Sequence, residues 1–416
     1  MTTTDFRAEA EVLAPQLVSW RRDLHQHPEL AFRETRTADL VARSLGSLDI
    51  EVRTHVGRTG VVGLLHGGRP GPTVMLRADM DGLPIQENSD APYVSQVPGV
   101  MHACGHDGHV AILLGAATLL SRHAADLPGD VLFVFQPAEE GLGGAAAMLA
   151  DGLLTDHGVP AAAFGLHLWN TMPMGRVCAQ AGPMMAAADV IQIVVRGRGG
   201  HGALPHEAVD AIAVTGQILS ALQTIVSRNV DPQETAVLTI GTVHGGTAFN
   251  VIAETVALEG TIRTFSPAVR ATVLTRLKVL LDGIAAGMGA RYELRVQDVA
   301  PAVVNDPGIT EVARAAAVQV VGATSVAWHA PLMVSEDFSE YQRLVPSCYM
   351  LLGSGNPALG LDVPHHNPRF DFDEQVLPLG AALLAAAARR FLLEGTIHPV
   401  CGNSPQSKGA YDDLTA

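Results

Sequence analysis

The chain has 416 residues, of which 48% are hydrophobic and 17% are charged, and its formal net charge is −15 at pH 7. This length suits two domains, and this composition is that of a globular protein rather than a disordered one. The negative charge argues against a nucleic-acid partner, which requires a basic surface. The apolar stretch Val110–Leu120 is too short to span a bilayer, so we expect no membrane partner either.

The cysteines are few and scattered along the chain. They are Cys104, Cys178, Cys348 and Cys401, and they form no closely spaced framework. The opening residues MTTTDFRAEAEVLAP lack the basic and apolar regions of a secretory signal. Because disulfides are rare in reducing compartments, these features predict a cytoplasmic protein.

Helix and strand patterns alternate through the first part of the chain. Residues 6–24 predict an amphipathic helix. Apolar runs bounded by turn residues at 71–79, 129–137 and 161–169 predict strands, and such runs are typical of parallel strands buried on both faces. A helix is predicted at Val110–His123, between the first two strands. This alternation indicates an α/β domain.

The pattern changes after residue 186. Residues 187–300 follow the order strand, helix, strand, strand, helix, strand, which is that of a ferredoxin-like unit. The α/β pattern then resumes, with a strand predicted at 347–355 and a helix at 375–393. We therefore predict one α/β domain formed by residues 1–186 and 301–398, an inserted βαββαβ domain at 187–300, and a flexible tail at 399–416.

Polar side chains follow three of the predicted strands. The first strand ends at Asp79 and Asp81, the second at Glu139 and Glu140, and the third at His167. Because ligands bind at the carboxyl ends of the strands in α/β sheets, we expect these side chains to converge on one crevice.

The stretch MHACGHDGH, residues 101–109, adds a thiol and imidazoles just before the predicted helix. Thiolate and imidazole suit zinc, and imidazole also suits manganese, cobalt or nickel. Cys104 and His106 can therefore be metal ligands, or alternatively a buried thiol and a capping histidine. For His109, one turn further along, packing or support of a ligand is favoured over metal binding.

Glu139 and Glu140 are adjacent, so their side chains should point in different directions. One can then hold a metal while the other takes a proton from a metal-bound water. The alternative is a solvated acidic loop, and the position at a strand end beside Cys104 and His106 favours the functional interpretation.

Nine motifs in order carry a family resemblance: RRDLHQHPEL, RADMDGLPIQE, MHACGHDGH, QPAEEG, GLHLW, GRGGHGALPH, NVIAETVALEGTIRTF, SEDF and PHHNPRFDFDE. Together they resemble the M20 family of metallopeptidases, and more narrowly its amidohydrolase branch. That branch includes hippurate hydrolases, N-acyl-amino-acid deacylases and auxin-conjugate hydrolases. The resemblance runs from about Ser19 to Glu374. It implies a zinc-peptidase-like catalytic domain with an inserted lid and dimerisation domain.

The resemblance also implies a site for two divalent metal ions, which would be zinc, manganese, cobalt or nickel. The positions that match its metal ligands are Cys104, His106, Glu140, His167 and His366. Of the two adjacent histidines in HHNPRF, the motif frame selects His366 over His365. Glu139 matches the general base, and Asp81 matches an aspartate that supports a metal ligand. The broader family has a His-x-Asp motif at Asp79–Asp81 and a bridging carboxylate where this branch has Cys104, which leaves the metal identity open.

In the inserted domain, the resemblance gives three residues a role. His201 matches a histidine that crosses a dimer to polarise the scissile carbonyl, and Asn250 and Arg263 match positions that hold the substrate's carboxylate or the reacting oxygen. By residue type alone, His201 would be a turn histidine and Arg263 a surface arginine. His25 and His27 are interpreted as structural. The expected assembly is a homodimer or a dimer-based tetramer.

The implied reaction is metal-dependent hydrolysis of a small N-acyl amino acid, such as an N-acetyl or N-benzoyl derivative, to a carboxylic acid and a free amino acid. A carboxypeptidase or dipeptidase would use the same chemistry with a different pocket, and activity on dipeptides would identify it. A non-catalytic metal- or ligand-binding dimer on this scaffold would be expected to lack Glu139, which this chain keeps. We expect residues 86–99 to line part of the entrance.

Overall fold

The computed structural model describes residues 4–156 and 158–395, so the predicted tail at 399–416 and Cys401 lie outside the described residues. The helices are α1 (Phe6–Gln26), α2 (Thr35–Gly46), α3 (His106–Arg122), α4 (Gly144–Ala150), α5 (Leu153–Asp156), α6 (Ala211–Asn229), α7 (Pro267–Met288), α8 (Pro307–Val321), α9 (Ser339–Gln342) and α10 (Val376–Glu394). The strands are β1 (Glu51–Val56), β2 (Gly60–Leu65), β3 (Arg69–Asp79), β4 (Pro128–Gln136), β5 (Ala162–Pro173), β6 (Val177–Cys178), β7 (Gly182–Met185), β8 (Ala187–Arg196), β9 (Gly200–His201), β10 (Ala236–Gly245), β11 (Val251–Ile252), β12 (Thr255–Thr264), β13 (Arg291–Ala300), β14 (Val303–Asn305) and β15 (Ser347–Gly355).

The larger domain is built on a seven-stranded sheet in the order β1-β2-β4-β3-β5-β15-β6. Its four central strands, β4, β3, β5 and β15, run parallel. The outer strands β1, β2 and β6 are antiparallel to their neighbours. The predicted α/β class is therefore confirmed, and the antiparallel edge strands are an addition to it.

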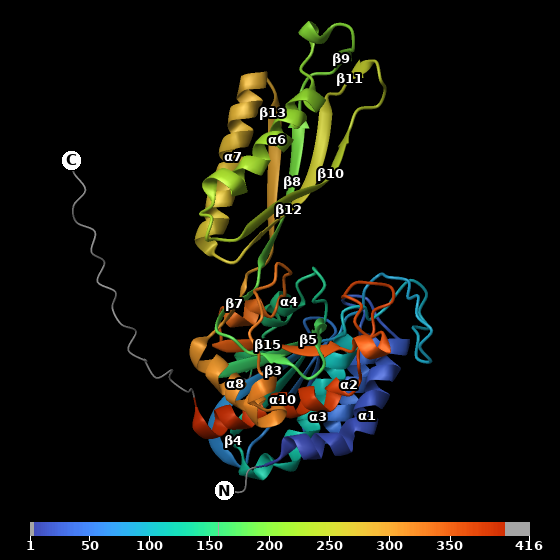
Figure 1. Cartoon of the computed structure of the whole chain (residues 1–416), viewed down its shortest axis with the longest axis vertical. Helices are drawn as coiled ribbons and strands as arrows, with labels where there is room; N and C mark the ends of the chain where they lie inside the picture. The colour runs from blue at the N-terminus through green and yellow to red at the C-terminus, as the bar shows by residue number, and fades with distance from the viewer. Residues whose placement is uncertain (1–3, 157, 396–416) are drawn as a thin grey trace, which may run out of the picture.

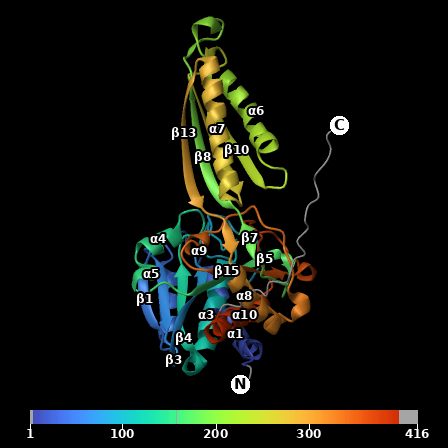
Figure 2. The same ribbon diagram turned by 90° about the vertical axis from the view of Figure 1, so that its left-hand side faces the viewer.

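Helices pack on both faces of this sheet (Figures 1 and 2). On one face, α1, α3, α8 and α10 pack over strand residues such as Leu76, Phe133 and Phe164. On the other face, α4, α5 and α9 cover the alternate residues, including Met75 and Leu132. The central strands are buried on both sides, which explains why their sequences carry no regular polar positions.

The second sheet has four strands in the order β10-β12-β8-β13, all antiparallel. Together with α6 and α7, these strands follow the chain order β8-α6-β10-β12-α7-β13. Ile193 and Leu258 face the two helices and form a separate hydrophobic core with Leu222 and Leu277. Both views show this unit, hereafter the small domain, standing away from the larger one (Figures 1 and 2).

Two adjacent strands connect the domains. The chain enters the small domain after β7 and leaves it into β14, and these two strands pair with each other, Met185 opposite Val303. Because entry and exit lie side by side, the small domain is attached through a narrow double connection. Motion at such a connection would change the distance between the two domains.

The helix α10 is the one described segment that is long and apolar enough to cross a membrane. However, 83% of its apolar window is buried inside the protein. It packs against α1, α3 and α8 and forms part of the core of the larger domain. Its apolar sequence is therefore explained by burial against other helices.

The helix that follows the MHACGHDGH stretch begins earlier than predicted. It starts at His106 rather than Val110, because Gly105 precedes it in a left-handed conformation at φ 86°. Glycine adopts this conformation at little cost and so permits the turn immediately before His106. His106 and His109 consequently both lie in the first helical turn.

Candidate active site

The structure brings together the five residues expected to bind metal. Cys104 Sγ lies 3.5 Å from His167 Nε2, and His366 Nε2 lies 3.1 Å from Glu140 Oε1. His106 completes one group with Cys104 and His167 and another with Glu139 and Glu140; within each group the ligand atoms lie within 4.8 Å of one another. These residues come from four separate parts of the chain and meet beside the carboxyl ends of β3 and β4. His167 lies within β5, because this strand continues to Pro173, beyond the end predicted for it at residue 169.

The two histidines of the first turn of α3 differ in how their ring nitrogens are used. His106 Nδ1 donates to the backbone oxygen of Asp81 at 2.9 Å, and its Nε2 is buried without a hydrogen-bond partner among the described residues. His109 Nδ1 donates to Asp79 at 2.6 Å, and its Nε2 accepts from the Leu168 amide at 3.0 Å. Only His106 therefore has a ring nitrogen left for a metal, and His109 supports the surrounding structure.

The surroundings of His106 favour a positive charge. Burial alone would lower the pKa of His106, but Asp79 and the Cys104 thiol outweigh burial and raise this pKa well above its ordinary value. Burial has the opposite outcome at His167, where it lowers the pKa well below the ordinary value and keeps the ring neutral. A neutral imidazole is the form that binds metal.

Asp81 fixes the two glutamates through their backbone. Its Oδ1 accepts from the Glu139 amide at 3.0 Å and its Oδ2 from the Glu140 amide at 3.1 Å. It thereby links the end of β3 to the loop that follows β4. Burial, with Glu336 and Glu140 nearby, raises the pKa of Glu139 well above its ordinary value.

The adjacent histidines near the C-terminal end are used differently. His366 is half exposed at 53%, and its amide donates to the Ala103 oxygen at 2.8 Å, next to Cys104. Hydrogen bonding to Cys104 and Glu140 raises the pKa of His366 to about 10. His365 instead stacks on Trp169, and its Nε2 bonds the Leu168 oxygen at 2.9 Å. This leaves His366 as the histidine of the pair that faces the other ligands.

A buried ion-pair network beside the site was not predicted from the sequence. Arg77 bonds Asp79 at 2.6 Å, Glu336 at 2.9 Å and Asp337 at 3.0 Å, and all four side chains are buried. Glu336 and Asp337 lie near Glu139, and all three residues line one cavity. The sequence does contain a signal for this network. Arg77 is a charged residue inside an otherwise apolar strand, where it needs buried partners of opposite charge.

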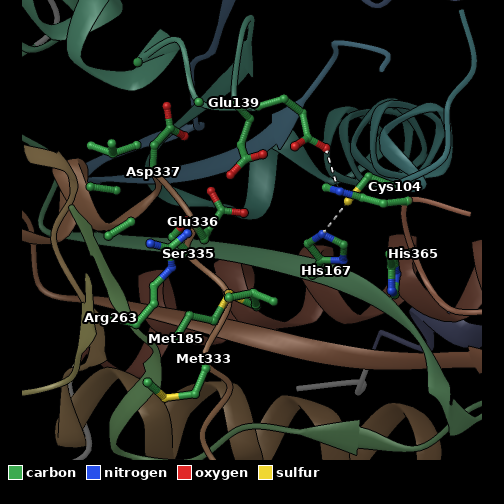
Figure 3. Close-up of a pocket in the computed structure, with 18 of the residues that line it drawn as sticks. Cys104, Glu139, His167, Met185, Arg263, Met333, Ser335, Glu336, Asp337 and His365 are labelled. Carbon is green, nitrogen blue, oxygen red and sulfur yellow. Dashed lines mark hydrogen bonds and ion pairs between the residues drawn. The ribbon is translucent and has the colours of Figure 1, made fainter. Parts of the chain in front are cut away.

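A cavity of about 790 Å³ lies between the two domains. Cys104, His167 and Glu139 line it (Figure 3), as does Glu140. Apolar side chains that line the rest include Trp169, Met185, Val190, Val299, Met333 and Val334. Arg263, from β12 of the small domain, also lines it, and Figure 3 shows the side chain extending into the cavity. Arg263 Nη1 donates to Thr261 Oγ1 at 2.8 Å, and burial lowers the pKa of Arg263.

Two expected site residues do not reach this cavity. His201 lies in β9 and Asn250 directly precedes β11, and both are exposed. Figure 1 places β9 and β11 at the end of the small domain farthest from the larger domain. Contact of these residues with such a cavity would therefore require a second copy of the chain or a large movement of the small domain.

The expectation for residues 86–99 is wrong, because none of them lines the cavity. This segment instead packs near α1. Glu87 Oε1 lies 3.4 Å from His25 Nε2, and Tyr93 donates to Asp371 at 2.8 Å. His25 is buried, consistent with a structural role, whereas His27 directly follows α1 and its Nδ1 donates to the Asp23 oxygen at 2.8 Å.

Arg21 is the centre of this second network. Its guanidinium is fully buried and bonds Asp107 at 2.9 Å, Asp371 at 2.6 Å and Glu374 at 3.2 Å. Asp107 follows His106 directly, and Asp371 lies five residues after His366. Arg21 thus joins two of the segments that carry candidate metal ligands.

The chain is similar to known proteins over most of its length. Residues 75–390 match the model of a family described as peptidase family M20/M25/M40. The N-acetylcysteine deacetylase of Bacillus subtilis is 40% identical over 374 residues, which cover 90% of this chain and 96% of that protein. Thermostable carboxypeptidase 1 of Saccharolobus solfataricus is 40% identical over 380 residues, covering 90% and 95% respectively. A solved structure, the Bacillus subtilis YXEP protein, described as a dinuclear metal binding peptidase from the M20 family, has a TM-score of 0.81 and 35% identity and covers 92% of this chain and 99% of its own.

Proposed function

The chain belongs to peptidase family M20/M25/M40, and from this we propose that it hydrolyses the amide bond of N-acyl amino acids with the help of two divalent metal ions. The observation that carries the proposal is the buried Nε2 atom of His106, which has no partner among the described residues and faces other metal-binding side chains. A buried polar atom left unpaired costs free energy, and a bound cation would remove that cost.

The donor set fits such ions. Cys104, His106, His167, Glu140 and His366 supply a thiol, three imidazoles and a carboxylate, in two groups that share Cys104. A thiolate with imidazoles favours zinc, and manganese, cobalt and nickel also fit the imidazoles and carboxylate. When bound, a pair of such ions would lower the pKa of a water molecule and polarise the acyl carbonyl.

Glu139 is proposed as the general base. Its carboxylate lines the cavity beside the ligand cluster, and its backbone is held by Asp81. Its carboxylate would take a proton from the attacking water and return it to the leaving amine nitrogen. A raised pKa at Glu139 is the direction expected of a group that both accepts and returns a proton near neutral pH.

Arg263 is proposed to bind the carboxylate of the amino-acid part. Its Nε and Nη2 atoms have no partner within the described part of the chain, and guanidinium pairs with carboxylate through two parallel hydrogen bonds. The apolar lining, including Trp169, Met185 and Met333, would contact the apolar part of the substrate. Substrate binding between the domains would also favour their closure.

We further propose a homodimer, alone or as half of a tetramer, in which His201 and Asn250 act in the partner's cavity. Their position at the far end of the small domain supports this, because they are remote from the cavity of their own chain (Figure 1). His201 would stabilise the charge that develops on the carbonyl oxygen. The three cysteines within the described residues are buried and free, which supports the proposed cytoplasmic location.

The test is amino-acid release from N-acetyl, N-benzoyl and indole-acyl amino acids and from dipeptides. The protein would be assayed after chelation and again after zinc, manganese or cobalt is restored, beside the Glu139→Gln variant. We expect metal-restored activity on N-acyl amino acids, and a decrease in kcat of about a hundredfold to ten thousandfold in the variant.

Two other results would change the assignment. Activity on peptides alone would favour a carboxypeptidase. The 40% identity to a thermostable carboxypeptidase is the observation that favours this alternative. Metal binding without hydrolysis of any of these substrates would refute the enzymatic proposal and favour a metal- or ligand-binding dimer.

A further inference from the structure

Glu34 does not make the hydrogen bond expected of a residue at the start of a helix. It occupies the N-cap position of α2, where a side chain normally accepts a hydrogen bond from the first turn, yet it makes no such bond. Glu29 does this instead, accepting from the Arg36 amide at 3.0 Å and the Thr37 amide at 2.9 Å. The Glu34 side chain is fully buried and is therefore used elsewhere.

The Glu34 carboxylate reaches the loop that carries the two glutamates of the site. Its Oε1 accepts from the Ala138 amide at 2.9 Å and from the Phe32 amide at 3.0 Å, and its Oε2 accepts from Thr59 Oγ1 at 2.5 Å. Ala138 directly precedes Glu139 and lies 104 residues after Glu34. The contact is therefore a tertiary anchor.

Glu34 and Asp81 accept hydrogen bonds from different backbone amides of this loop. Glu34 takes the amide of Ala138, and Asp81 takes the amides of Glu139 and Glu140. Two buried carboxylates thus hold three successive backbone amides. The direction of the Glu139 and Glu140 side chains depends on the backbone that these carboxylates fix.

The backbone of this loop would not hold its shape unaided. Ala138 has φ 53°, a left-handed conformation that residues with a side chain rarely adopt. The Ala138 oxygen accepts from the Gly144 amide at 3.0 Å, and a Cβ added at Gly144 would lie 1.6 Å from the Pro137 oxygen. Such strained turns persist only where surrounding contacts determine them.

We propose that Glu34 is a positioning residue, whose hydrogen bond to Ala138 keeps the loop in the conformation that directs Glu139 and Glu140 at the cavity. The inference rests on the proposed roles of those two glutamates. It assigns a function to the buried acidic residue of the stretch HPELAFRET, which has no contact with the cavity itself.

The first experiment compares Glu34→Ala with Glu34→Gln in the full-length, metal-loaded protein. The alanine variant should lower kcat about tenfold to a hundredfold with KM within about threefold, because a misplacement near one ångström has such an effect on rate. Glutamine should keep kcat within about threefold, since its amide oxygen can still accept from Ala138 while its NH₂ group donates to Thr59.

Glu29→Ala is the matched control. This neighbouring carboxylate also accepts two backbone amides, but they belong to α2 and not to the loop of Glu139. It should lower the unfolding temperature while leaving kcat per folded protein unchanged. If Glu29→Ala and Glu34→Ala lower kcat equally, Glu34 has a general structural role and the inference is overturned.

A second variant tests the strain directly. Glycine adopts positive φ readily, so Ala138→Gly should keep the loop conformation with less help from Glu34. The double variant Glu34→Ala/Ala138→Gly should recover at least about threefold of the lost kcat, whereas Ala138→Gly alone should change it little. If Glu34→Ala does not fold, Glu34→Asp replaces it, because its shorter carboxylate cannot reach Ala138.

The activities of Glu34→Ala and Glu139→Gln separate the positioning role of Glu34 from the proposed role of Glu139 as the base. Full activity in Glu34→Ala, beside an inactive Glu139→Gln, would overturn only the positioning role. No rescue by Ala138→Gly would overturn it as well. Full activity in Glu139→Gln would instead overturn the proposed role of the base on which the inference rests.

Discussion

The ligand cluster (Cys104, His106, Glu140, His167 and His366) and the tip of the small domain (β9 and β11) differ in how firmly they are held. Around the cluster, Asp81 binds two amides of the glutamate loop, and the His366 amide binds the Ala103 oxygen. At the tip, the hydrogen bond described for the His201 ring is local, from the Ala203 amide at 3.0 Å, and Phe249 is fully exposed. The cluster is thus preorganised within one chain, whereas the tip exposes groups that have only local contacts among the described residues.

This difference fits the proposed roles of the two regions, which are metal binding for the cluster and action in a partner's cavity for the tip. Metal ligands must be fixed accurately, and fixed ligands require buried supporting contacts. A group that is delivered to another copy of the chain must stay on the surface until the copies meet. Variants of the two regions should consequently fail in different ways.

His106→Ala should have the largest effect. It removes the unpaired buried nitrogen, so metal affinity and kcat/KM should each fall by about a thousandfold or more. His109→Ala is the matched control in the same helical turn. It removes a supporting contact and should lower metal affinity only about tenfold to a hundredfold. Competition with a coloured chelator measures both affinities, and a larger loss in His109→Ala would contradict this assignment of the ligand.

The sequence predicts the position of the ligand cluster well for a physical reason. Apolar runs mark the central strands, and polar residues directly after them must lie at the carboxyl edge of the sheet. The choice between His106 and His109 depends on more. Both lie in the first turn of α3, and the Leu168 amide that occupies His109 comes from a strand 59 residues away.

Other features could not be predicted from the local pattern. Glu34 has the sequence position of a helix cap, and its actual partner, Ala138, is brought near only by the fold. For His201 the resemblance supplied a role, but its distance from its own cavity depends on how the small domain is attached. Tertiary contacts of this kind leave little trace in a single sequence.

Arg21→Met should have the next largest effect. The variant leaves the buried carboxylate of Asp107 without its charged partner, so the free energy of unfolding should fall by about 3–5 kcal/mol. Arg22→Met is the control, because Arg22 is 44% exposed and, among the described residues, forms an ion pair only with Glu374. Its guanidinium also lies over the Tyr93 ring, 4.6 Å from the ring centroid. That substitution should cost less than about 1 kcal/mol.

Chemical unfolding monitored by circular dichroism measures both changes. Because Arg21 joins the segments of Asp107 and Asp371, weaker metal binding should accompany the lower stability of Arg21→Met. Equal stability losses in the two variants would show that the buried network does not hold the ligand segments.

His201→Ala should have a smaller effect of a different kind. It should lower kcat about a hundredfold to a thousandfold, as expected for loss of a group that stabilises an oxyanion, while stability and metal content stay unchanged. His206→Ala is the control, since His206 is also exposed near the tip, at 72%, and should leave kcat unchanged.

Mixing two inactive variants identifies the chain on which His201 acts. If it acts in the partner's cavity, His201→Ala and Glu139→Gln chains that exchange subunits should form mixed dimers with one intact site. Random exchange makes half of the dimers mixed, so about a quarter of the unmodified activity should return. If His201 acted in its own cavity, every site in the mixture would lack one group and no activity would return. The exposed tip would then require closure of the small domain onto its own chain, and its contrast with the preorganised cluster would reflect domain motion instead of assembly.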